Sequence, residues 1–276
     1  MKGKSVYKSM GKVVFAGAGP GDPELITMKA LRYLREADVI ISDRLVSPEL
    51  FHADLKDGAI IQYVGKQGGK EESTSQQTIN KLLVEYALQN KVVLRLKGGD
   101  VSFFSNILSE LRALIENDVS FEIIPGVTSA SGAAAYAGIP LTARGYATSV
   151  RFVTCYDMET IAPSLWDELA TTSDTLVFYM SSDVLLTVVT KLLNCKISLD
   201  KELAVIEQAT TLYQKVHIYK LNEFVATSDA IRFLSPTMII IGRVVALHKD
   251  FKWIENSMST ETYFMPLKKI SYEQLN

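Results

Sequence analysis

Two side chains in the first third of the chain could handle protons: the carboxylate of Asp43 and the amine of Lys66. Each follows a short apolar segment typical of a buried strand, Val39–Ser42 for the aspartate and Ile60–Val64 for the lysine. Loops beyond two such strands could bring the carboxylate and the amine together as general base and general acid. The alternatives are an aspartate that only caps a turn and a lysine that is only a solvated charge.

A glycine-rich loop, GAGPGD from Gly17 to Asp22, follows the predicted strand 13–16. It resembles a dinucleotide-binding turn, and Asp43 lies about 20 residues further on, where such proteins place a ribose-binding acid. However, the third glycine of that pattern is missing, Pro20 has no N–H for a phosphate, and Asp22 would repel one. The loop therefore favours a ligand other than NAD, with a plain turn that binds nothing as the alternative.

The elements that must position these loops alternate between strand and helix through the first half of the chain. Strands are expected over 13–16, 39–42, 60–64, 91–96 and 120–124, with helices over 23–37, 76–89 and 106–117. We expect Asp22 to cap the first of these helices, which begins with Pro23. The alternation favours a mostly parallel sheet covered by helices on both faces. Ligands of such sheets bind beyond the carboxyl ends of the strands, where the segments GAGPGD, DRLV, GKQGGK and KGGD all fall.

The pattern changes from Pro125. Residues 127–138 predict a small-residue helix packed closely against a neighbour or a ligand, or else an ordinary alanine-rich core helix. Strands are expected over 150–154, 175–179, 203–206 and 238–241, a helix over 182–194, and an antiparallel strand over 214–220. We therefore expect two α/β domains, a mostly parallel one over 11–124 and one with a mixed sheet over 125–251, followed by a polar tail over 252–276.

Composition narrows the classes of function. Lysine and arginine number 29 against 31 aspartates and glutamates, so no overall positive field would attract nucleic acid. No apolar run approaches the roughly 20 residues that span a membrane, and the first residues lack a signal-peptide core. We expect a cytoplasmic protein with neither nucleic acid nor membrane as partner. The two cysteines and three histidines show no metal-ligand spacing, so no metal is expected.

From Val13 to about Val245 the chain resembles the tetrapyrrole methylases. The resemblance rests on segments in the family's order: VVFAGAGPGDPELIT, ADVIISDRLVS, VGKQGGK, VLRLKGGD, IIPGVTSASGAAAYAGIPLTARG and VFYM. GAGPGDP and PGVT are typical of the whole family, whereas DRLV followed by GKQGGK resembles its members that methylate uroporphyrinogen III. It implies two α/β domains with S-adenosylmethionine in the cleft between them, in a homodimer. The implied reaction adds methyl groups to two pyrrole carbons of uroporphyrinogen III, giving precorrin-2 for sirohaem or cobalamin synthesis.

The resemblance also implies roles for individual residues. Asp43 would be the proton acceptor and Lys66 the proton donor. The cofactor contacts carried over by motif are Pro20, Gly98, Gly99, Asp100, Phe103, Thr128, Ser129, Met180 and Ala209. Because the substrate is rich in carboxylates and the chain is net negative, we also expect local cations to hold it. Those in or beside the motif loops are Arg44, Lys66, Lys70, Arg144 and Arg151.

The chain departs from the family pattern in one stretch. After KGGD the family usually continues with a glycine-rich FGRGGEE stretch, but here Val101–Glu110 reads VSFFSNILSE, without the arginine or the glycines. Ala209 stands where glycine is common and Ser129 where alanine is common. One alternative is a methylase of a later precorrin, which the GKQGGK segment disfavours. Another is a non-catalytic cofactor-binding module, which the retained Asp43 and Lys66 disfavour.

Overall fold

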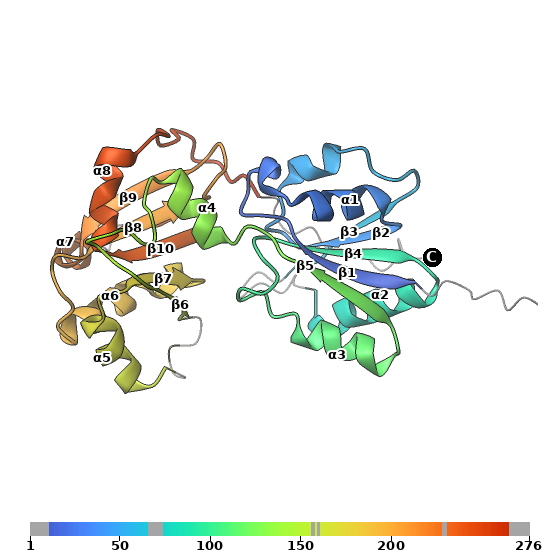
Figure 1. Ribbon diagram of the computed structural model, residues 1–276, viewed down its shortest axis with the longest axis horizontal. Helices are drawn as coiled ribbons and strands as arrows, with labels where there is room; N and C mark the ends of the chain where they lie inside the picture. Colours follow the sequence, from blue (N-terminus) through green and yellow to red (C-terminus); the bar gives the residue numbers. More distant parts are fainter. Residues whose placement is uncertain (1–10, 66–73, 156–157, 159–160, 228–230, 265–276) are drawn as a thin grey trace, which may run out of the picture. The chain divides into compact units, whose positions relative to one another are not determined.

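The structure is a computed structural model that describes residues 11–65, 74–155, 158, 161–227 and 231–264 (Figure 1). The chain divides into two compact units, Met1–Thr128 with Phe264–Asn276, and Ser129–Tyr263. The domain boundaries expected from the sequence, 11–124 and 125–251, stay predictions. No helix within the described ranges is long and apolar enough to cross a membrane.

The first unit is built on a five-stranded sheet in the order β3-β2-β4-β1-β5, and every pairing in it is parallel. The strands are β1 (Lys12–Gly17), β2 (Val39–Ser42), β3 (Ile60–Tyr63), β4 (Val92–Lys97) and β5 (Ser120–Ile124). The helices are α1 (Met28–Glu36), α2 (Gln76–Leu88) and α3 (Leu108–Glu116), with short 3₁₀ helices η1 (Pro23–Leu25) and η2 (Pro48–His52). The predicted strands and parallel sheet are confirmed.

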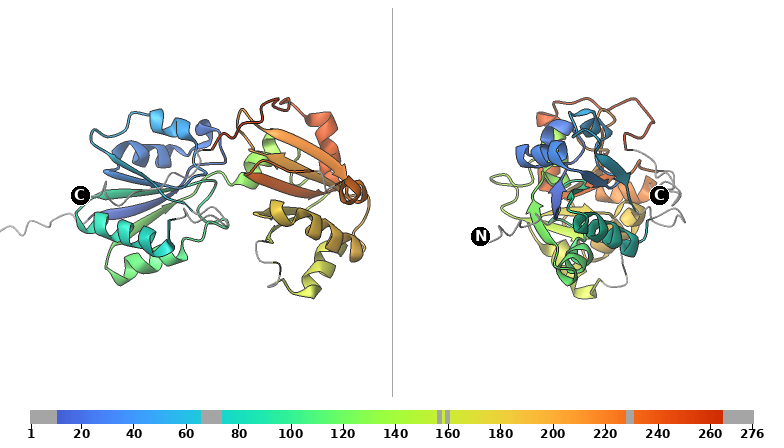
Figure 2. Two further views of the ribbon diagram at one scale, coloured as in Figure 1. Left: turned by 180° about the vertical axis from the view of Figure 1, so that it is seen from behind. Right: turned by 90° about the vertical axis from the view of Figure 1, so that its right-hand side faces the viewer.

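Helices cover both faces of this sheet, because its apolar runs are buried on both sides. Leu34 of α1 packs with Val14, Ile40 and Leu94 of the strands on one face. On the other face α2 and α3 lie together, as Figures 1 and 2 show from opposite sides.

The helix predicted over 23–37 is wrong in one respect, because the chain breaks it in two. Asp22 does cap the first turn, accepting a hydrogen bond from the Glu24 N–H at 2.8 Å, and Pro23 begins that turn. The 3₁₀ helix then ends at Ile26, which is extended, and Thr27 caps α1 by accepting from the Ala30 N–H at 3.3 Å. A second side-chain cap inside the predicted helix explains the break.

The second unit holds a five-stranded mixed sheet in the order β6-β7-β10-β8-β9, in which only β6 and β7 pair in parallel. Its strands are β6 (Val150–Thr154), β7 (Thr175–Tyr179), β8 (Glu202–Glu207), β9 (Lys215–Lys220) and β10 (Thr237–Gly242). Its helices are α4 (Ser129–Tyr136), α5 (Pro163–Thr171), α6 (Leu185–Asn194), α7 (Leu221–Thr227) and α8 (His248–Phe251), with 3₁₀ helices η4 (Ser182–Val184) and η6 (Arg243–Leu247). The mixed sheet is confirmed, whereas α5, α7 and α8 were not predicted, and the helix predicted over 182–194 divides into η4 and α6.

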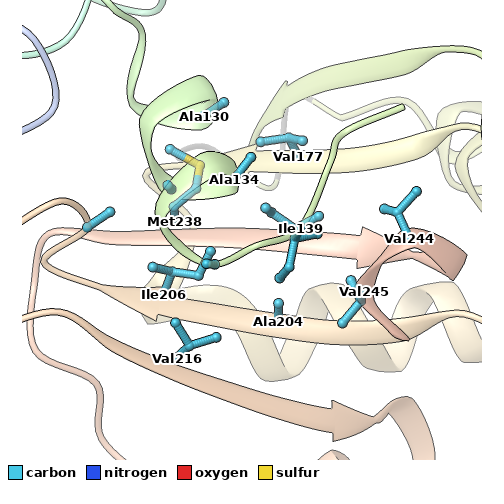
Figure 3. Packing of buried hydrophobic residues seen from close by; sticks show 14 of the residues in the cluster. Ala130, Ala134, Ile139, Val177, Ala204, Ile206, Val216, Met238, Val244 and Val245 are labelled. Carbon is cyan, nitrogen blue, oxygen red and sulfur yellow. The ribbon is translucent and has the colours of Figure 1, made fainter. Parts of the chain in front are cut away.

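The alanine-rich helix α4 packs closely on one face of this sheet. Figure 3 shows Ala130 and Ala134 next to Val177 of β7 and Met238 of β10, in a cluster whose members are all buried. Small side chains let the helix approach the strands closely. The alanine-rich stretch therefore forms part of the core, and its first residue, Ser129, is also the last residue of the PGVTS motif. Helices α5 and α6 cover the opposite face.

Residues 253–263, here called the C-terminal segment, form no helix or strand yet are fastened to the second unit. The side chain of Asn256 accepts from the Val216 N–H at 2.7 Å and donates to the Val216 carbonyl at 3.0 Å, covering the edge strand β9. The Ser257 N–H donates to the Gln214 carbonyl at 2.9 Å. This part of the expected tail therefore belongs to the second unit, and residues 265–276 lie outside the described residues.

Candidate functional site

In the first unit, four of the motif loops leave the same edge of the sheet. They follow β1, β2, β4 and β5, and because these strands are parallel, their carboxyl ends share one edge. The loops carry Pro20, Asp43, the Gly98–Asp100 turn and Gly126. The ligand-binding edge of an open parallel sheet lies in this position.

Four glycines let the loops after β1, β4 and β5 touch backbone to backbone: Gly17, Gly19, Gly99 and Gly126. A Cβ atom on Gly17 would lie 2.5 Å from the Gly99 carbonyl oxygen, and one on Gly126 would lie 2.4 Å from the same atom. Gly19 has a φ of 83° and exchanges two backbone hydrogen bonds with Gly99, of 3.2 and 2.6 Å. Any larger residue at Gly17 or Gly126 would separate these loops, so the glycines fix the shape of the edge.

Asp100 ties two of the loops together. Its side chain is 6% exposed, and one carboxylate oxygen accepts from the Ser102 N–H at 2.7 Å while the other accepts from the Gly126 N–H at 2.6 Å. A carboxylate can accept about four hydrogen bonds, so these two leave capacity for ligand donors. Asp100 is therefore both a structural anchor and a group that could bind a polar ligand.

Asp43 lies against the turn after β4. Its Oδ1 accepts from the Gly98 N–H at 3.2 Å, and its own N–H donates to the Leu96 carbonyl at 3.2 Å. The neighbouring Arg44 is half-buried; burial lowers the pKa of its guanidinium, and the charge of Asp43 acts in the opposite direction. The structure thus brings together Asp43, Arg44 and the Gly98 turn, three of the features predicted from the sequence.

Lys66 and Lys70 lie outside the described residues, and their expected roles stay predictions. Hydrogen bonds of the residues on either side of 66–73 show where that segment begins and ends. The Val64 N–H donates to the Ser42 carbonyl at 2.7 Å, so the last residues before Lys66 run beside the end of β2 that carries Asp43. On the far side, the Thr74 N–H donates to the Gly65 carbonyl at 3.0 Å, which holds the flanks of residues 66–73 together.

A buried ion pair beneath this edge was missed by the sequence reasoning. Arg95 of β4 donates from Nε to Glu110 Oε1 of α3 at 2.9 Å, with the two residues 2% and 1% exposed. Arg95 Nη1 also donates to the carbonyls of Ile41 on β2 and Leu96 on β4, at 3.2 and 3.3 Å. Lys97 Nζ lies 3.9 Å from the second glutamate oxygen. Arg95 thus joins β2 to β4 just before the loops begin. A charged residue inside the apolar strand 91–96 was the signal that such a partner must exist.

In the second unit, Met180 and Ala209 also share one sheet edge. Strand β10 is antiparallel to both β7 and β8, so β7 and β8 run in the same direction, and the two residues follow their carboxyl ends. Met180 has a φ of 51° and is half-exposed, while Ala209 is flanked by Gln208 and Thr210 with φ of 45° and 67°. Non-glycine residues rarely adopt positive φ, and such conformations gather at functional sites.

The start of α4 lies near the end of β7. The Ala130 N–H donates to Tyr179 Oη at 3.2 Å, which places the neighbouring Ser129, a predicted cofactor contact, beside this strand end. Thr128 is half-buried and is the last residue of the first unit before Phe264. In the first unit, Phe103 follows Asp100 and is partly exposed, with its N–H donating to the Asp100 carbonyl at 3.3 Å.

The two arginines of the second unit that were expected to hold substrate carboxylates, Arg144 and Arg151, differ in their surroundings. Arg144 is exposed in the loop before β6. Arg151 of β6 instead donates to Asp174 at 2.7 Å and to Glu168 at 3.4 Å, and the hydrogen bond to Asp174 contributes most to raising its pKa. A role for Arg151 in holding substrate would compete with these ion pairs. Among the described residues, no group of three or more His, Cys, Asp or Glu side chains could hold a metal ion.

In each unit, helices pack on a five-stranded sheet and motif loops lie at the carboxyl ends of its strands, as in ligand-binding α/β proteins. Comparison with known sequences gives the family. The chain matches the family model of the Tetrapyrrole (Corrin/Porphyrin) Methylases over residues 12–225. This match covers most of the chain, and the chain belongs to that family. The fold class and the methyltransferase class expected from the sequence are confirmed.

Three relatives place the chain within the family. The siroheme synthase of Saccharophagus degradans is 43% identical over 249 residues, which are 90% of this chain and 54% of that protein. The uroporphyrin III C-methyl transferase of Thermus thermophilus, in its native form, aligns with a TM-score of 0.71 and 34% identity, over 86% of this chain and 100% of that one. A structure of the same enzyme is complexed with S-adenyl homocysteine, at a TM-score of 0.70 and 33% identity over 85% of this chain and 93% of that one. A cobalt precorrin-4 methyltransferase aligns with a TM-score of 0.73 and 28% identity, over 88% of this chain and 99% of that one.

The chain spans about half the length of the curated siroheme synthases that it matches. Its family match and its structural neighbours concern the methylase region, so any step beyond methyl transfer lies outside what these relatives support.

Proposed function

We propose that the protein transfers methyl groups from S-adenosylmethionine to two pyrrole carbons of uroporphyrinogen III, giving precorrin-2 for sirohaem or cobalamin synthesis. The observation that carries this proposal is the position of Asp43, held by the Gly98 N–H at the loop edge where Asp100 and the glycine turns meet. The likeness to the Thermus thermophilus enzyme supports it.

The residues present fit the proposed cofactor. S-adenosylmethionine carries an ammonium, ribose hydroxyls and an adenine amine, all of which are donors, and Asp100 offers a nearly buried carboxylate with acceptor capacity left over from its two backbone N–H partners. Pro20 has no N–H to offer a phosphate, but this cofactor has no phosphate. The residues expected to hold it are Pro20, Gly98, Gly99, Asp100, Phe103 and Thr128 in the first unit, and Ser129, Met180 and Ala209 in the second.

When bound, the cofactor supplies a methyl group that is already activated by its sulfonium, so the protein's main task is to align the reacting atoms. The methylated pyrrole carbon, which already bears a carboxylate side chain, becomes quaternary and leaves the ring positively charged, so the charge is relieved by loss of a proton from a neighbouring position of the ring system. The Asp43 carboxylate accepts that proton, and its negative charge stabilises the cationic ring until the proton leaves. Lys66 is the proposed proton donor.

Anaerobic incubation with S-adenosylmethionine and uroporphyrinogen III tests this directly, with mass spectrometry counting the methyl groups on the extracted tetrapyrrole. The expected gain is two. Asp43→Asn should lower the rate by about 100-fold or more, since a positioned base contributes at least that factor. Asp57→Asn, an exposed aspartate in the turn before β3, is the matched control and should leave the rate unchanged.

The second candidate is a methylase of a later corrin precursor, favoured by the TM-score of 0.73 to the cobalt precorrin-4 methyltransferase. A protein that binds S-adenosylmethionine yet adds no methyl group to uroporphyrinogen III would support this candidate instead. The same assay with precorrin substrates would then identify the acceptor.

The cations proposed to hold the substrate carboxylates are Arg44, Lys66, Lys70, Arg144 and Arg151. Charge reversal at Arg44, which lies beside Asp43, should raise the Michaelis constant for substrate more than reversal at Arg151, which already pairs with Asp174 and Glu168. We also propose a homodimer, which sedimentation of the purified protein would test.

A further inference from the structure

The loop after β8 keeps two buried residues in a backbone conformation that is unfavourable for them. Gln208 is fully buried with a φ of 45°, and Thr210 is 5% exposed with a φ of 67°. Threonine is β-branched, which makes positive φ especially unfavourable. Such conformations persist only when the surroundings over-determine them, so something outside the loop must hold it.

The C-terminal segment provides the first anchor. The Gln208 side-chain amide donates from Nε2 to the Glu261 carbonyl at 3.0 Å and accepts at Oε1 from the Tyr263 N–H at 2.7 Å. The Gln208 side chain thus both donates to and accepts from the backbone of the C-terminal segment, as a neighbouring strand would. Both of its polar atoms have hydrogen-bond partners within the protein. The Tyr213 hydroxyl, just after the loop, adds a 3.0 Å hydrogen bond to the Glu261 carboxylate.

A second glutamine provides another anchor. Gln214 accepts at Oε1 from the Thr210 N–H at 2.8 Å and donates from Nε2 to the Tyr136 carbonyl at the end of α4, at 3.3 Å. Its own carbonyl accepts from the Ser257 N–H at 2.9 Å. The loop, the end of α4 and the C-terminal segment are therefore joined through two glutamine side chains. Ala209 lies between the two anchored residues.

We propose that the C-terminal segment positions the Ala209 loop for S-adenosylmethionine. Gln208 is the positioning residue, because its side chain connects the loop to that segment. The assignment rests on the proposed function, in which Ala209 contacts the cofactor. The segment lies beyond residues 12–225, which the family model matches, so the methylase sequence pattern does not include it.

The same segment also covers the edge strand β9 through Asn256, and this second role gives a matched control. Asn256→Ala removes two hydrogen bonds to Val216, and Gln208→Ala removes two to Glu261 and Tyr263. Both variants should lower the unfolding midpoint. Only Gln208→Ala should raise the dissociation constant for S-adenosylmethionine, by about tenfold, because only it releases the loop. Asn256→Ala should change that constant by less than about twofold.

Three measurements on the intact chain test the proposal: calorimetric binding of S-adenosylmethionine, amide hydrogen exchange over residues 208–211 without ligand, and steady-state kinetics. Gln208→Ala should speed the exchange and raise KM for S-adenosylmethionine while kcat at saturation stays nearly unchanged. Equal loss of affinity in both variants, or unchanged loop exchange in Gln208→Ala, would overturn the proposal. If the wild-type protein bound no S-adenosylmethionine, the proposed function and the cofactor role of the loop would both fall. Faster exchange in Gln208→Ala would then still show that the segment anchors the loop.

Discussion

The loop edge of the first unit and the loop after β8 in the second unit achieve unusual backbone paths by opposite means. At the first edge, side chains are removed: Gly17 and Gly126 approach the Gly99 carbonyl so closely that no Cβ atom fits. In the second unit, side chains are kept, and Gln208 and Thr210 adopt positive φ while buried.

The difference teaches what each loop depends on. A glycine loop meets its own conformational demands and needs only its immediate neighbours, such as the carboxylate of Asp100. A strained loop without glycine depends on side-chain anchors, here Gln214 close by in sequence and the C-terminal segment more than 50 residues further on. Substitutions should therefore damage the first edge by steric clash or lost charge, and the second loop by lost anchors.

The largest expected effect comes from Glu110→Ala, which would leave Arg95 buried without its carboxylate beneath the first edge. Removing one partner of a buried pair costs about 3–5 kcal/mol of unfolding free energy. Denaturant unfolding at neutral pH measures it, and Glu116→Ala at the exposed end of α3 is the control. A loss of less than about 1 kcal/mol would mean that Arg95 finds another partner.

Gly126→Ala should have the next largest effect, because its new Cβ would lie 2.4 Å from the Gly99 carbonyl oxygen. Overpacking against backbone costs about 1–3 kcal/mol, or more where nothing can move. The contrast is Gly145→Ala in the second unit, where φ is 84° but no atom lies within 4 Å of the added carbon. Conformational strain alone should cost about 1 kcal/mol there. Equal losses of unfolding free energy in the two variants would contradict the steric account.

Asp100→Asn keeps the shape of the side chain but replaces one acceptor oxygen with a donor that faces a backbone N–H. Hydrogen bonds to a charged group contribute about 1.5–3 kcal/mol, so we expect a loss near 2 kcal/mol. Hydrogen exchange at the Gly126 amide should also become faster. The control is Asp118→Asn, an exposed aspartate whose φ of 53° asparagine tolerates equally well. Unchanged exchange at the Gly126 amide would mean that Asp100 does not hold the loop after β5 in place.

Each unit also carries a carboxyl group with a pKa near 2, and these should give the smallest effect. The pKa of Glu122 falls from 4.5 to about 2, chiefly through Lys29 and Tyr33, and that of Asp174 falls from 3.8 to about 2, chiefly through Ser149 and Arg151. Because both values are lowered in the folded state, the stabilisation is present above about pH 5 and is lost as pH falls toward 2.

Thermal unfolding of the wild type and of Asp174→Asn across this pH range checks the sign. The difference between their midpoints should be largest above about pH 5 and should shrink toward pH 2, where Asp174 becomes protonated. A difference that stays constant with pH would assign the stability of this site to something other than the ionised carboxylate. Glu122→Gln offers the same comparison in the first unit.

Much of the fold could be predicted because it follows from local patterns. The apolar run at Val13–Ala16 is completely buried, and alternation of strands and helices gave the parallel sheet. The helical pattern alone does not predict the break after η1, since Thr27 fits an ordinary helix position until its side chain is seen to cap α1. Helices α5 and α7 were missed because they are short, nine and seven residues, and a helical period is hard to recognise over so few turns.

In the functional site, too, residues in local motifs could be predicted, whereas partners on distant elements could not. Motif residues such as Asp43 and Gly98 were found, and the structure brings them within hydrogen-bond distance. The partner of Arg95 lies 15 residues away on another element, so no spacing rule identifies Glu110. The anchoring of Gln208 by residues 53 and 55 positions later depends on a segment without regular structure, which carries no periodic signal.

The chain contains two tryptophans, Trp166 and Trp253, in very different surroundings. Trp166 is buried in the core of the second unit, with Lys191 over its ring. Trp253, at the start of the C-terminal segment, is 64% exposed and donates from its indole to the Ala135 carbonyl at 2.9 Å, edge-on to Tyr136. An aqueous quencher would therefore dim the emission of one indole and spare the other. The protein thus carries an intrinsic optical reporter on the segment that holds the Ala209 loop, and detachment of that segment could be followed in unlabelled protein in real time.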